Sequence, residues 1–483
     1  MGLSKILSLP VILVCASQAL AQTRLEADFS QRLITLNVVA TDAKGAPVDD
    51  LRTADVQVRE DGKPHPVVFF RFAGSRRPIA PAGPGEFINR PAPPATVILL
   101  DRWNEKLMTM AAAWQDLRAA LARLESLDRV YVYILTNRGD VVPVYPLPPA
   151  DADLRAPAPP APEDLVARLN DAVRTLTGLR DVETLDPFQR VDTTMRALGI
   201  FSKMASIAGR KNLLWVTHGF PLQLLDQSGQ WIDLTRQVQN LAQMAARAQV
   251  AIYTVDQSAE GSGADVAGSS RLTLETFAGV SGGRWYASGR TSDAMAGTMT
   301  DARGNYRLAY YSYSPVRETG WKERKIRVDT VRKGVHLLAR EGHFGDAGAS
   351  DPEQMAENAF DRESHSPFEA TEIALRATVS HKPSAVHFDI RVDPQDVLIE
   401  HRGARFQGGL TVKFAFYRGG IFQGPGPTIQ KDLDYTQEQL NQVFKDGIVI
   451  LLDVAVSDQL EQVRVMVFDR RLHSLGSVTI PVG

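Results

Sequence analysis

Residues 96–101 read Thr96-Val97-Ile98-Leu99-Leu100-Asp101, an unbroken apolar run that ends in an aspartate. Such a run predicts a strand that is buried on both faces, as in a parallel sheet. Further apolar runs follow at 130–135, 212–216 and 250–255, and stretches of helical periodicity lie between them. This alternation predicts an α/β fold over residues 96–302, with a central, mostly parallel sheet flanked by helices.

The segments on either side of this region predict antiparallel β structure. Residues 22–75 form a strand-rich N-terminal β unit with a hairpin signal at Asp61-Gly62. We expect the antiparallel β segment at 303–345 to pack with this unit or with the central sheet, and residues 368–483 to form a C-terminal β-sandwich. The Pro-rich stretch 76–95 and the small, polar stretch 346–367 predict linkers.

The first residues predict a signal peptide over 1–21. Lys5 precedes an apolar core at 6–14, and Ala19-Leu20-Ala21 is a small-x-small cleavage site. The apolar core is too short to span a membrane, and no later segment is apolar enough to do so. We therefore expect an exported protein, periplasmic or secreted, with lipidation of Cys15 as the alternative.

Charge and cysteine content exclude several classes of function. The chain has one cysteine, Cys15, so cleavage leaves none for disulfides or thiolate catalysis. Lysine and arginine number 54 against 56 aspartate and glutamate residues, and no basic run stands out. Nucleic acid is excluded as a partner because phosphate binding needs a concentrated positive face.

Three further stretches occur in a recognisable order. They are Leu36-Asn37-Val38-Val39-Ala40-Thr41-Asp42, Gly209-Arg210-Lys211-Asn212-Leu213-Leu214-Trp215-Val216 and Tyr306-Arg307-Leu308-Ala309-Tyr310-Tyr311. In this combination residues 30–345 resemble the von Willebrand factor A (VWA)-related family that is abundant in acidobacteria. The resemblance implies a Rossmann-like VWA domain at 96–302 and does not extend to residues 368–483.

The same resemblance implies a metal-ion-dependent adhesion site (MIDAS), here degenerate. Asp101 stands where the first aspartate belongs, and Thr194 (or Thr193) is the candidate loop hydroxyl. Hard oxygen ligands suit Mg²⁺ or Mn²⁺. The predicted metal ligands are Asp101, Asn104 and Thr194, with His218 and Asp256 as secondary candidates.

Several positions depart from the MIDAS pattern. Trp103 and Glu105 replace the two expected hydroxyls, and His218 replaces an aspartate, which leaves Zn²⁺ as another cation at that histidine. The alternative without metal is that Asp101 and Asn104 cap the helix that follows.

One motif resembles a catalytic signature. Gly279-Val280-Ser281-Gly282-Gly283 matches the G-x-S-x-G spacing, but a predicted helix precedes it and a predicted strand follows. A nucleophile elbow needs the opposite order, so we predict a helix end and a turn instead. No catalytic residue is predicted.

The functional prediction is a non-enzymatic protein-binding module. Trp103, Glu105 and His218 form the expected partner-binding rim, because aromatic side chains at such rims often anchor protein partners. One alternative is a metal-dependent hydrolase that uses the same rim. Another is an inert structural component of an envelope complex. The sequence does not set the oligomeric state.

Overall fold

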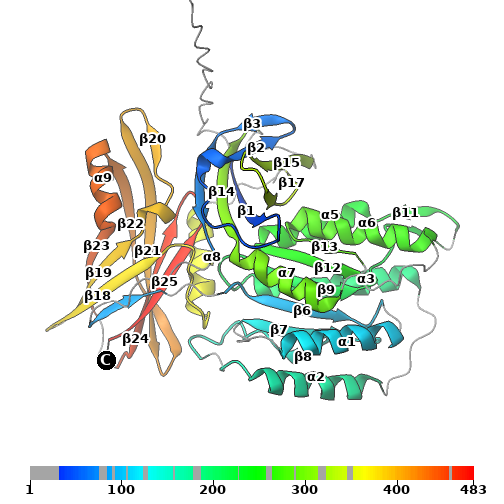
Figure 1. Cartoon of the computed structure of the whole chain (residues 1–483). Coiled ribbons are helices and arrows are strands. Elements are labelled where there is room, and N and C mark those ends of the chain that lie inside the picture. The colour runs from blue at the N-terminus through cyan, green and yellow to red at the C-terminus, as the bar shows by residue number, and fades with distance from the viewer. Residues whose placement is uncertain are drawn as a thin grey trace, which may run out of the picture.

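The computed structural model describes residues 32–482 except 75–83, 90–92, 105–106, 123–128, 156–157, 178–185, 227, 257–263, 288–289, 314–322, 345–351, 384 and 456–458 (Figure 1). The predicted signal peptide and Cys15 lie outside these residues. Among the described helices, none has the length and apolar character needed to cross a membrane.

The predicted fold class is wrong. The chain is mostly β, and five of the six sheets formed by the described residues are antiparallel throughout. The sixth sheet is mixed, because its edge strand β8 (Val141–Tyr145) runs antiparallel to β7 (Val130–Leu135). A short turn at 136–140 joins these two strands, and a connection of that length can only reverse the chain. The alternation of apolar runs and helical segments at 96–302 decided the predicted fold class, although the segments before and after it are rich in β structure.

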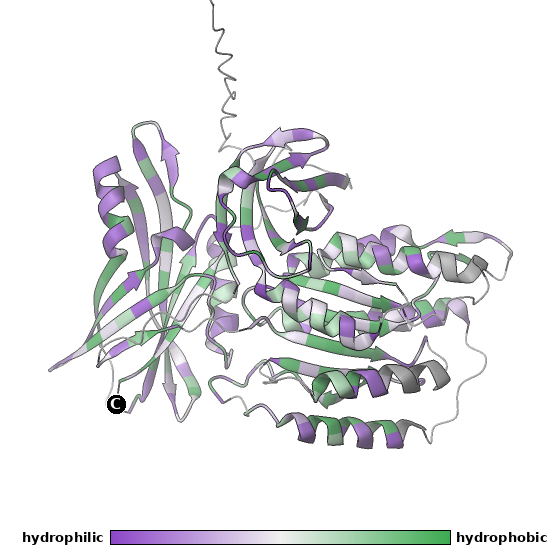
Figure 2. Ribbon diagram, in the orientation of Figure 1, coloured by the Kyte–Doolittle hydropathy of each residue, from purple (hydrophilic) through white to green (hydrophobic). Residues whose placement is uncertain are grey.

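The mixed sheet has the strand order β13-β12-β9-β6-β7-β8. Its parallel pairs join β6 (Thr96–Asp101) to β7 and to β9 (Lys211–Thr217), β9 to β12 (Val250–Asp256), and β12 to β13 (Trp285–Tyr286). Hydrophobic residues concentrate along these strands between two helix layers (Figure 2). Helices near the sheet are α1 (Leu107–Leu121), α2 (Pro162–Thr177), α3 (Pro187–Leu198), α4 (Phe201–Met204), α5 (Thr235–Arg247), α6 (Ala264–Ser281) and α7 (Thr291–Arg303).

Alternate side chains of β6 enter two separate cores. Val97 and Leu99 pack on one face with residues of α3, α5 and α6. Ile98 and Leu100 pack on the other face with residues of α1, α2 and α7. Strict alternation follows from the period of two in a strand and explains why the whole run is apolar.

The N-terminal strands and the strands after α7 together form one β unit. One sheet has the order β16-β1-β14-β4 and the other β17-β15-β2-β3, and their inner faces share a hydrophobic core. The strands are β1 (Arg32–Asp42), β2 (Val56–Glu60), β3 (Lys63–His65), β4 (Val67–Phe72), β14 (Asn305–Ser312), β15 (Glu323–Thr330), β16 (Val335–Leu338) and β17 (Gly342–Phe344), with a 3₁₀ turn η1 (Thr53–Asp55).

The C-terminal strands form two antiparallel sheets around one core. The elements are β18 (Leu375–Lys382), β19 (Ala385–Val392), η2 (Pro394–Asp396), β20 (Glu400–Arg402), β21 (Arg405–Arg418), β22 (Ile421–Tyr435), α9 (Gln437–Asp446), β23 (Ile448–Val454), β24 (Gln462–Asp469) and β25 (Leu475–Pro481). Two segments predicted as linkers are ordered here: β5 (Glu86–Ile88) pairs with β18, and residues 352–364 form helix α8 (Pro352–Ser364).

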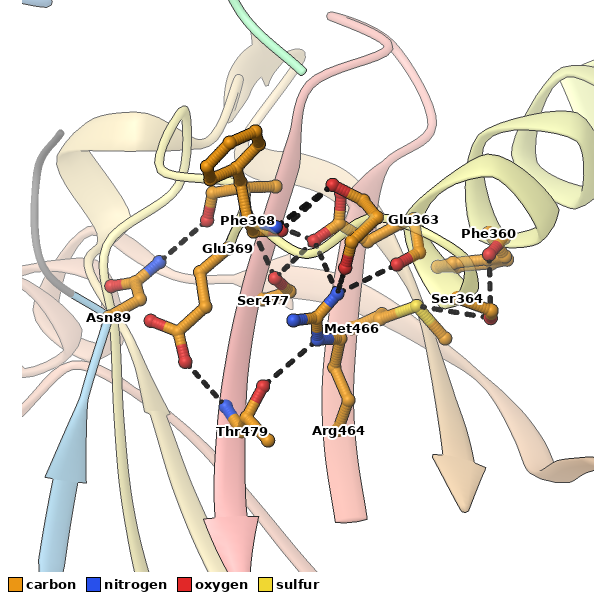
Figure 3. A network of polar contacts seen from close by, with 12 residues as sticks. Asn89, Phe360, Glu363, Ser364, Phe368, Glu369, Arg464, Met466, Ser477 and Thr479 are labelled. Atoms are coloured by element: carbon orange, nitrogen blue, oxygen red, sulfur yellow. Dashed lines mark hydrogen bonds and ion pairs between the residues drawn. The ribbon is translucent and has the colours of Figure 1, made fainter. Parts of the chain in front are cut away.

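A buried ion pair fastens α8 to the C-terminal sheets (Figure 3). Arg464 Nη1 lies 3.5 Å from Glu363 Oε1, and the two side chains are 1% and 2% exposed. The same guanidinium donates to the carbonyls of Glu363 and Ser366, and its Nε donates to Thr479 Oγ1. Because the ion pair and the two carbonyl contacts are buried, the end of α8 is held firmly against β24 and β25.

Candidate functional site

The candidate site lies at the carboxyl edge of the mixed sheet. Asp101 is the last residue of β6, and Thr217 is the last residue of the neighbouring strand β9. Parallel strands bring their ends to one edge, which is where open α/β sheets bind ligands. Both side chains are fully buried.

Hydrogen bonds occupy both oxygens of the Asp101 carboxylate. Oδ1 accepts the backbone N–H of Asn104 at 3.0 Å. Oδ2 accepts from Asn104 Nδ2 at 2.7 Å, from Thr217 Oγ1 at 2.7 Å and from Trp215 Nε1 at 3.1 Å. Burial raises the pKa of Asp101, whereas the hydrogen bonds from Asn104, Thr217 and Trp215 lower it, and burial prevails.

The network continues from Asn104 into α3. Asn104 Nδ2 also donates to Thr194 Oγ1 at 2.8 Å, and Thr194 Oγ1 donates to the carbonyl of Arg190 at 2.9 Å. Trp103 Nε1 donates to that same carbonyl at 3.0 Å. The three predicted metal ligands Asp101, Asn104 and Thr194 therefore lie together, as contacting members of one hydrogen-bond network.

These residues do not fit a divalent cation. The described residues contain no group of three or more His, Cys, Asp or Glu side chains that could hold a metal ion. Mg²⁺ needs near-octahedral oxygen coordination. The one carboxylate already accepts four hydrogen bonds, and within this network only Asn104 Oδ1 is buried without a partner. A cation would have to displace donors that currently satisfy Asp101.

The helix-cap alternative does not hold for Asp101. Asp101 accepts the N–H of Asn104, but residues 102–104 are not helical, and α1 is described from Leu107. The interaction therefore closes a turn ahead of the helix. Asp101 and Asn104 hold the end of β6 to β9 and α3, which is a structural role.

The predicted rim is only partly at the surface. The structure buries Trp103, which is 7% exposed and packs in the core beside α3, so its predicted role as an exposed anchor is wrong. Glu105 lies outside the described residues. His218 and Asp256 are half-buried, and Asp256 pairs in register with Thr217.

Ser281 of the G-x-S-x-G match has a structural role. It is the last residue of α6, and its Oγ donates to the Phe277 carbonyl at 2.6 Å and accepts the Ile252 N–H at 2.8 Å. Gly282 follows with φ +85°, a left-handed conformation that favours glycine. The predicted helix end and turn are confirmed.

An exposed hairpin that was not predicted from the sequence follows β9. Its strands are β10 (Gln223–Leu225) and β11 (Trp231–Asp233). Leu225 and Trp231 face each other across the strands, and they are 51% and 69% exposed. Leu224 points the other way into the core, so the hairpin is amphipathic. The available signal in the sequence was the Asp226-x-Ser228-Gly229 turn pattern between the apolar pairs Leu224-Leu225 and Trp231-Ile232.

Hydrogen bonds to Asp226 connect the described residues on either side of the turn. Asp226 Oδ1 accepts from Ser228 N, Ser228 Oγ and Gln230 N at 2.7–2.8 Å. These bonds lower the pKa of Asp226, and the bond from the Ser228 hydroxyl has the largest effect. At the base, the Leu234 N–H donates to the Leu222 carbonyl at 2.7 Å. Leu225 and Trp231 are thus presented on a fixed backbone.

Comparisons with known proteins identify no family. No protein-family model matches the chain, and no curated protein matches it. Two solved structures show weak likeness. A point mutant of the PilB minor pilin from Streptococcus sanguinis has 12% identity and a TM-score of 0.25, with 47% of this chain and 62% of that chain covered. The human COPII-coat protein Sec24c has 12% identity and a TM-score of 0.24, with 84% and 48% covered. This chain spans less than two thirds of either protein, and such scores carry no argument about fold or function.

Proposed function

We propose that this protein is a metal-independent protein-binding module, exported to the periplasm or beyond the cell, that contacts its partner through the β10–β11 hairpin. The observation that carries the proposal is the exposed cross-strand pair Leu225 and Trp231 on a rigid, anchored hairpin. The expectation of a binding rim is retained, but its anchor moves from Trp103 to Trp231. The protein partner and the exported location rest on the sequence.

Trp231 has the properties of a binding hot spot. Buried tryptophan side chains contribute a large contact area, and tryptophan is enriched among residues that dominate interface energies. The hairpin backbone is already ordered by the Asp226 bonds, so binding loses little conformational entropy. A large exposed apolar pair on a rigid element is costly to solvate and indicates an interaction surface.

The hydrolase alternative is less favoured. It requires a metal-bound water at the rim, and the Asp101 network does not fit a cation. The inert structural alternative predicts that Trp231 makes no specific contact. Experiment can separate a binding hairpin from an inert one.

Site-specific photo-crosslinking in the cells that make the protein tests the proposal. We expect a photoreactive amino acid at position 231 to give a discrete protein adduct, and the same amino acid at Leu451 (59% exposed, on β23) to give none. With the partner purified, Trp231→Ser should weaken binding roughly 30-fold, the loss of about 2 kcal/mol typical of a hot spot. Leu451→Ser should leave the Kd unchanged. Equal adducts at both positions, or an unchanged Kd for Trp231→Ser, would contradict the proposal.

A further inference from the structure

A large basic cavity lies at the amino edge of the mixed sheet, opposite the Asp101 edge. Its volume is about 700 Å³. The start of β9, the end of α5, strands β1 and β14, helix α8 and the loop before β25 all contribute to its lining. Figure 1 shows α8 between the C-terminal sheets and the rest of the molecule. Nine arginine and lysine side chains line the cavity, against two glutamates.

Three of these cations are almost fully buried. Arg210, Lys211 and Arg307 are 8%, 2% and 7% exposed. Arg210 Nη2 donates to Tyr253 Oη at 2.9 Å and to the Gly282 carbonyl at 3.2 Å. These are neutral acceptors, and Arg210 Nε is buried without a hydrogen-bond partner.

Lys211 also has a neutral acceptor. Its Nζ donates to the Ile207 carbonyl at 2.7 Å. Arg307 donates from Nη2 to the Leu472 carbonyl at 2.9 Å and forms an ion pair with Glu372 at 3.2 Å. Its Nε is again buried without a hydrogen-bond partner. Burying cations with so little compensation is unfavourable, and an anion in the cavity would offset that cost.

The two glutamates do not neutralise the cavity. Glu363 pairs with Arg464, which lies outside the lining, and also accepts from Ser477 Oγ and Ala370 N. Glu372 is shared between Arg307, Gln249 Nε2 and the Leu475 N–H. The lining therefore supplies one available carboxylate, and among the other lining cations Arg470 pairs with Asp432 outside the lining, whereas Arg210 and Lys211 have neutral acceptors.

Burial disfavours the protonated form of two lining groups. The pKa of Lys211 is lowered to about 7, first by burial; Glu372 opposes the shift, and Arg362 adds a smaller lowering. The pKa of His473 is lowered by burial and then by Arg307. Because burial is the main cause in both cases, an anion beside these groups would favour their protonated forms.

We propose that this cavity binds a small molecule that carries a diphosphate or triphosphate group. Arginine forks match phosphate oxygens in a bidentate geometry, and arginine dominates the lining. The volume falls within the roughly 300–1,000 Å³ typical of small-molecule sites. A multivalent phosphate suits the surplus of positive charge better than a single carboxylate. Arg247 and Arg362 line the cavity and are exposed, so a ligand can reach it from solvent.

Isothermal titration of the full chain with sodium pyrophosphate at low ionic strength tests this inference. We expect saturable 1:1 binding that weakens as salt is added. Arg307→Gln should raise the Kd about tenfold or more, because it removes charge-assisted hydrogen bonds. Arg362→Gln changes an exposed side chain that folding does not need, and it should raise the Kd about threefold. The matched control is Arg174→Gln on α2, whose side chain is 78% exposed and pairs with Asp171.

Parallel titrations identify the ligand class. Tighter binding of ADP than of pyrophosphate supports a nucleotide, and equal binding supports a free diphosphate group. Citrate carries a similar charge on carboxylates, so stronger binding of citrate than of pyrophosphate overturns the phosphate assignment. The absence of saturable heat with pyrophosphate, or an equal Kd for Arg362→Gln and Arg174→Gln, overturns the site.

Discussion

Replacement of Asp101 by alanine tests whether the carboxyl edge of the mixed sheet is a closed hydrogen-bond network. The carboxylate accepts four hydrogen bonds of 2.7–3.1 Å in a fully buried position. Asp101→Ala leaves Trp215 Nε1, the Asn104 N–H and the Thr217 hydroxyl without their acceptor. Asn104 Nδ2 keeps only Thr194 Oγ1.

The expected loss of stability follows from the donors left unsatisfied. Each buried donor without a partner costs about 1–3 kcal/mol. Three such donors, together with the weakened Asn104 Nδ2 contact, give a loss of roughly 3–9 kcal/mol. For a domain of this size, that corresponds to a fall in melting temperature of about 10 °C or more.

Differential scanning fluorimetry with and without Mg²⁺ measures the effect. Asp192→Ala is the matched control, because this α3 aspartate is 68% exposed and makes a single i,i+4 ion pair with Arg196. The control should change stability by less than about 0.5 kcal/mol. We expect Mg²⁺ and EDTA to leave the wild-type melting temperature unchanged. A rise with Mg²⁺ that is lost in Asp101→Ala would refute the closed network and restore Asp101 as a metal ligand.

Three further predictions concern charge, anchoring and surface chemistry. Lys211 has a pKa of about 7 in the folded chain, below its usual 10.5. Between these two pH values the unfolded chain binds more protons than the folded chain, so the free energy of unfolding rises with pH. Lys211→Met should therefore flatten the pH dependence of the denaturation midpoint. Arg464→Met leaves Glu363 buried without its cation and should lower the free energy of unfolding by about 3–5 kcal/mol. The measurement is amide hydrogen exchange, which should become faster in α8. Unchanged exchange would contradict the anchoring role of Arg464. Trp231→Ser should change the melting temperature by less than about 2 °C while weakening partner binding, because the ring is exposed; a large destabilisation would make Trp231 a structural residue.

The sequence was informative wherever local pattern determines structure. The apolar run at 96–101 is a fully buried strand, and its neighbours at 130–135, 212–216 and 250–255 pair with it or beside it. The predicted fold class was wrong because the β-rich segments are paired over long distances in the sequence. β1 pairs with β14, about 270 residues away, and β5 pairs with β18, and no local periodicity reports such partners. Strand β5 was not predicted for two reasons. It lies in a Pro-rich stretch, and its three residues are too few to show alternation.

The position of the candidate site could be predicted from the sequence, but the burial and hydrogen bonding of its side chains could not. Strand ends at one edge of a parallel sheet must meet, so the proximity of Asp101 and Thr217 followed from the strand assignments. The direction of Trp103 did not follow, because a residue just after a strand can turn outward or inward. Here it turns inward and donates to the Arg190 carbonyl on α3, a helix whose placement depends on long-range packing.

The two edges of the mixed sheet differ in how their buried charged groups are compensated. This difference distinguishes a structural site from a ligand site. At the carboxyl edge, one anion meets four donors, and exchanging any of them for a cation would leave donors unsatisfied. At the amino edge, Arg210 and Lys211 meet neutral carbonyl and hydroxyl oxygens, so an added anion would improve the electrostatics without displacing a partner. The motif that looks functional in the sequence is therefore satisfied internally. Arg210 and Lys211, which belong to neither the metal-site pattern nor the G-x-S-x-G match, are the side chains that lack compensation, and the pyrophosphate titration addresses them directly.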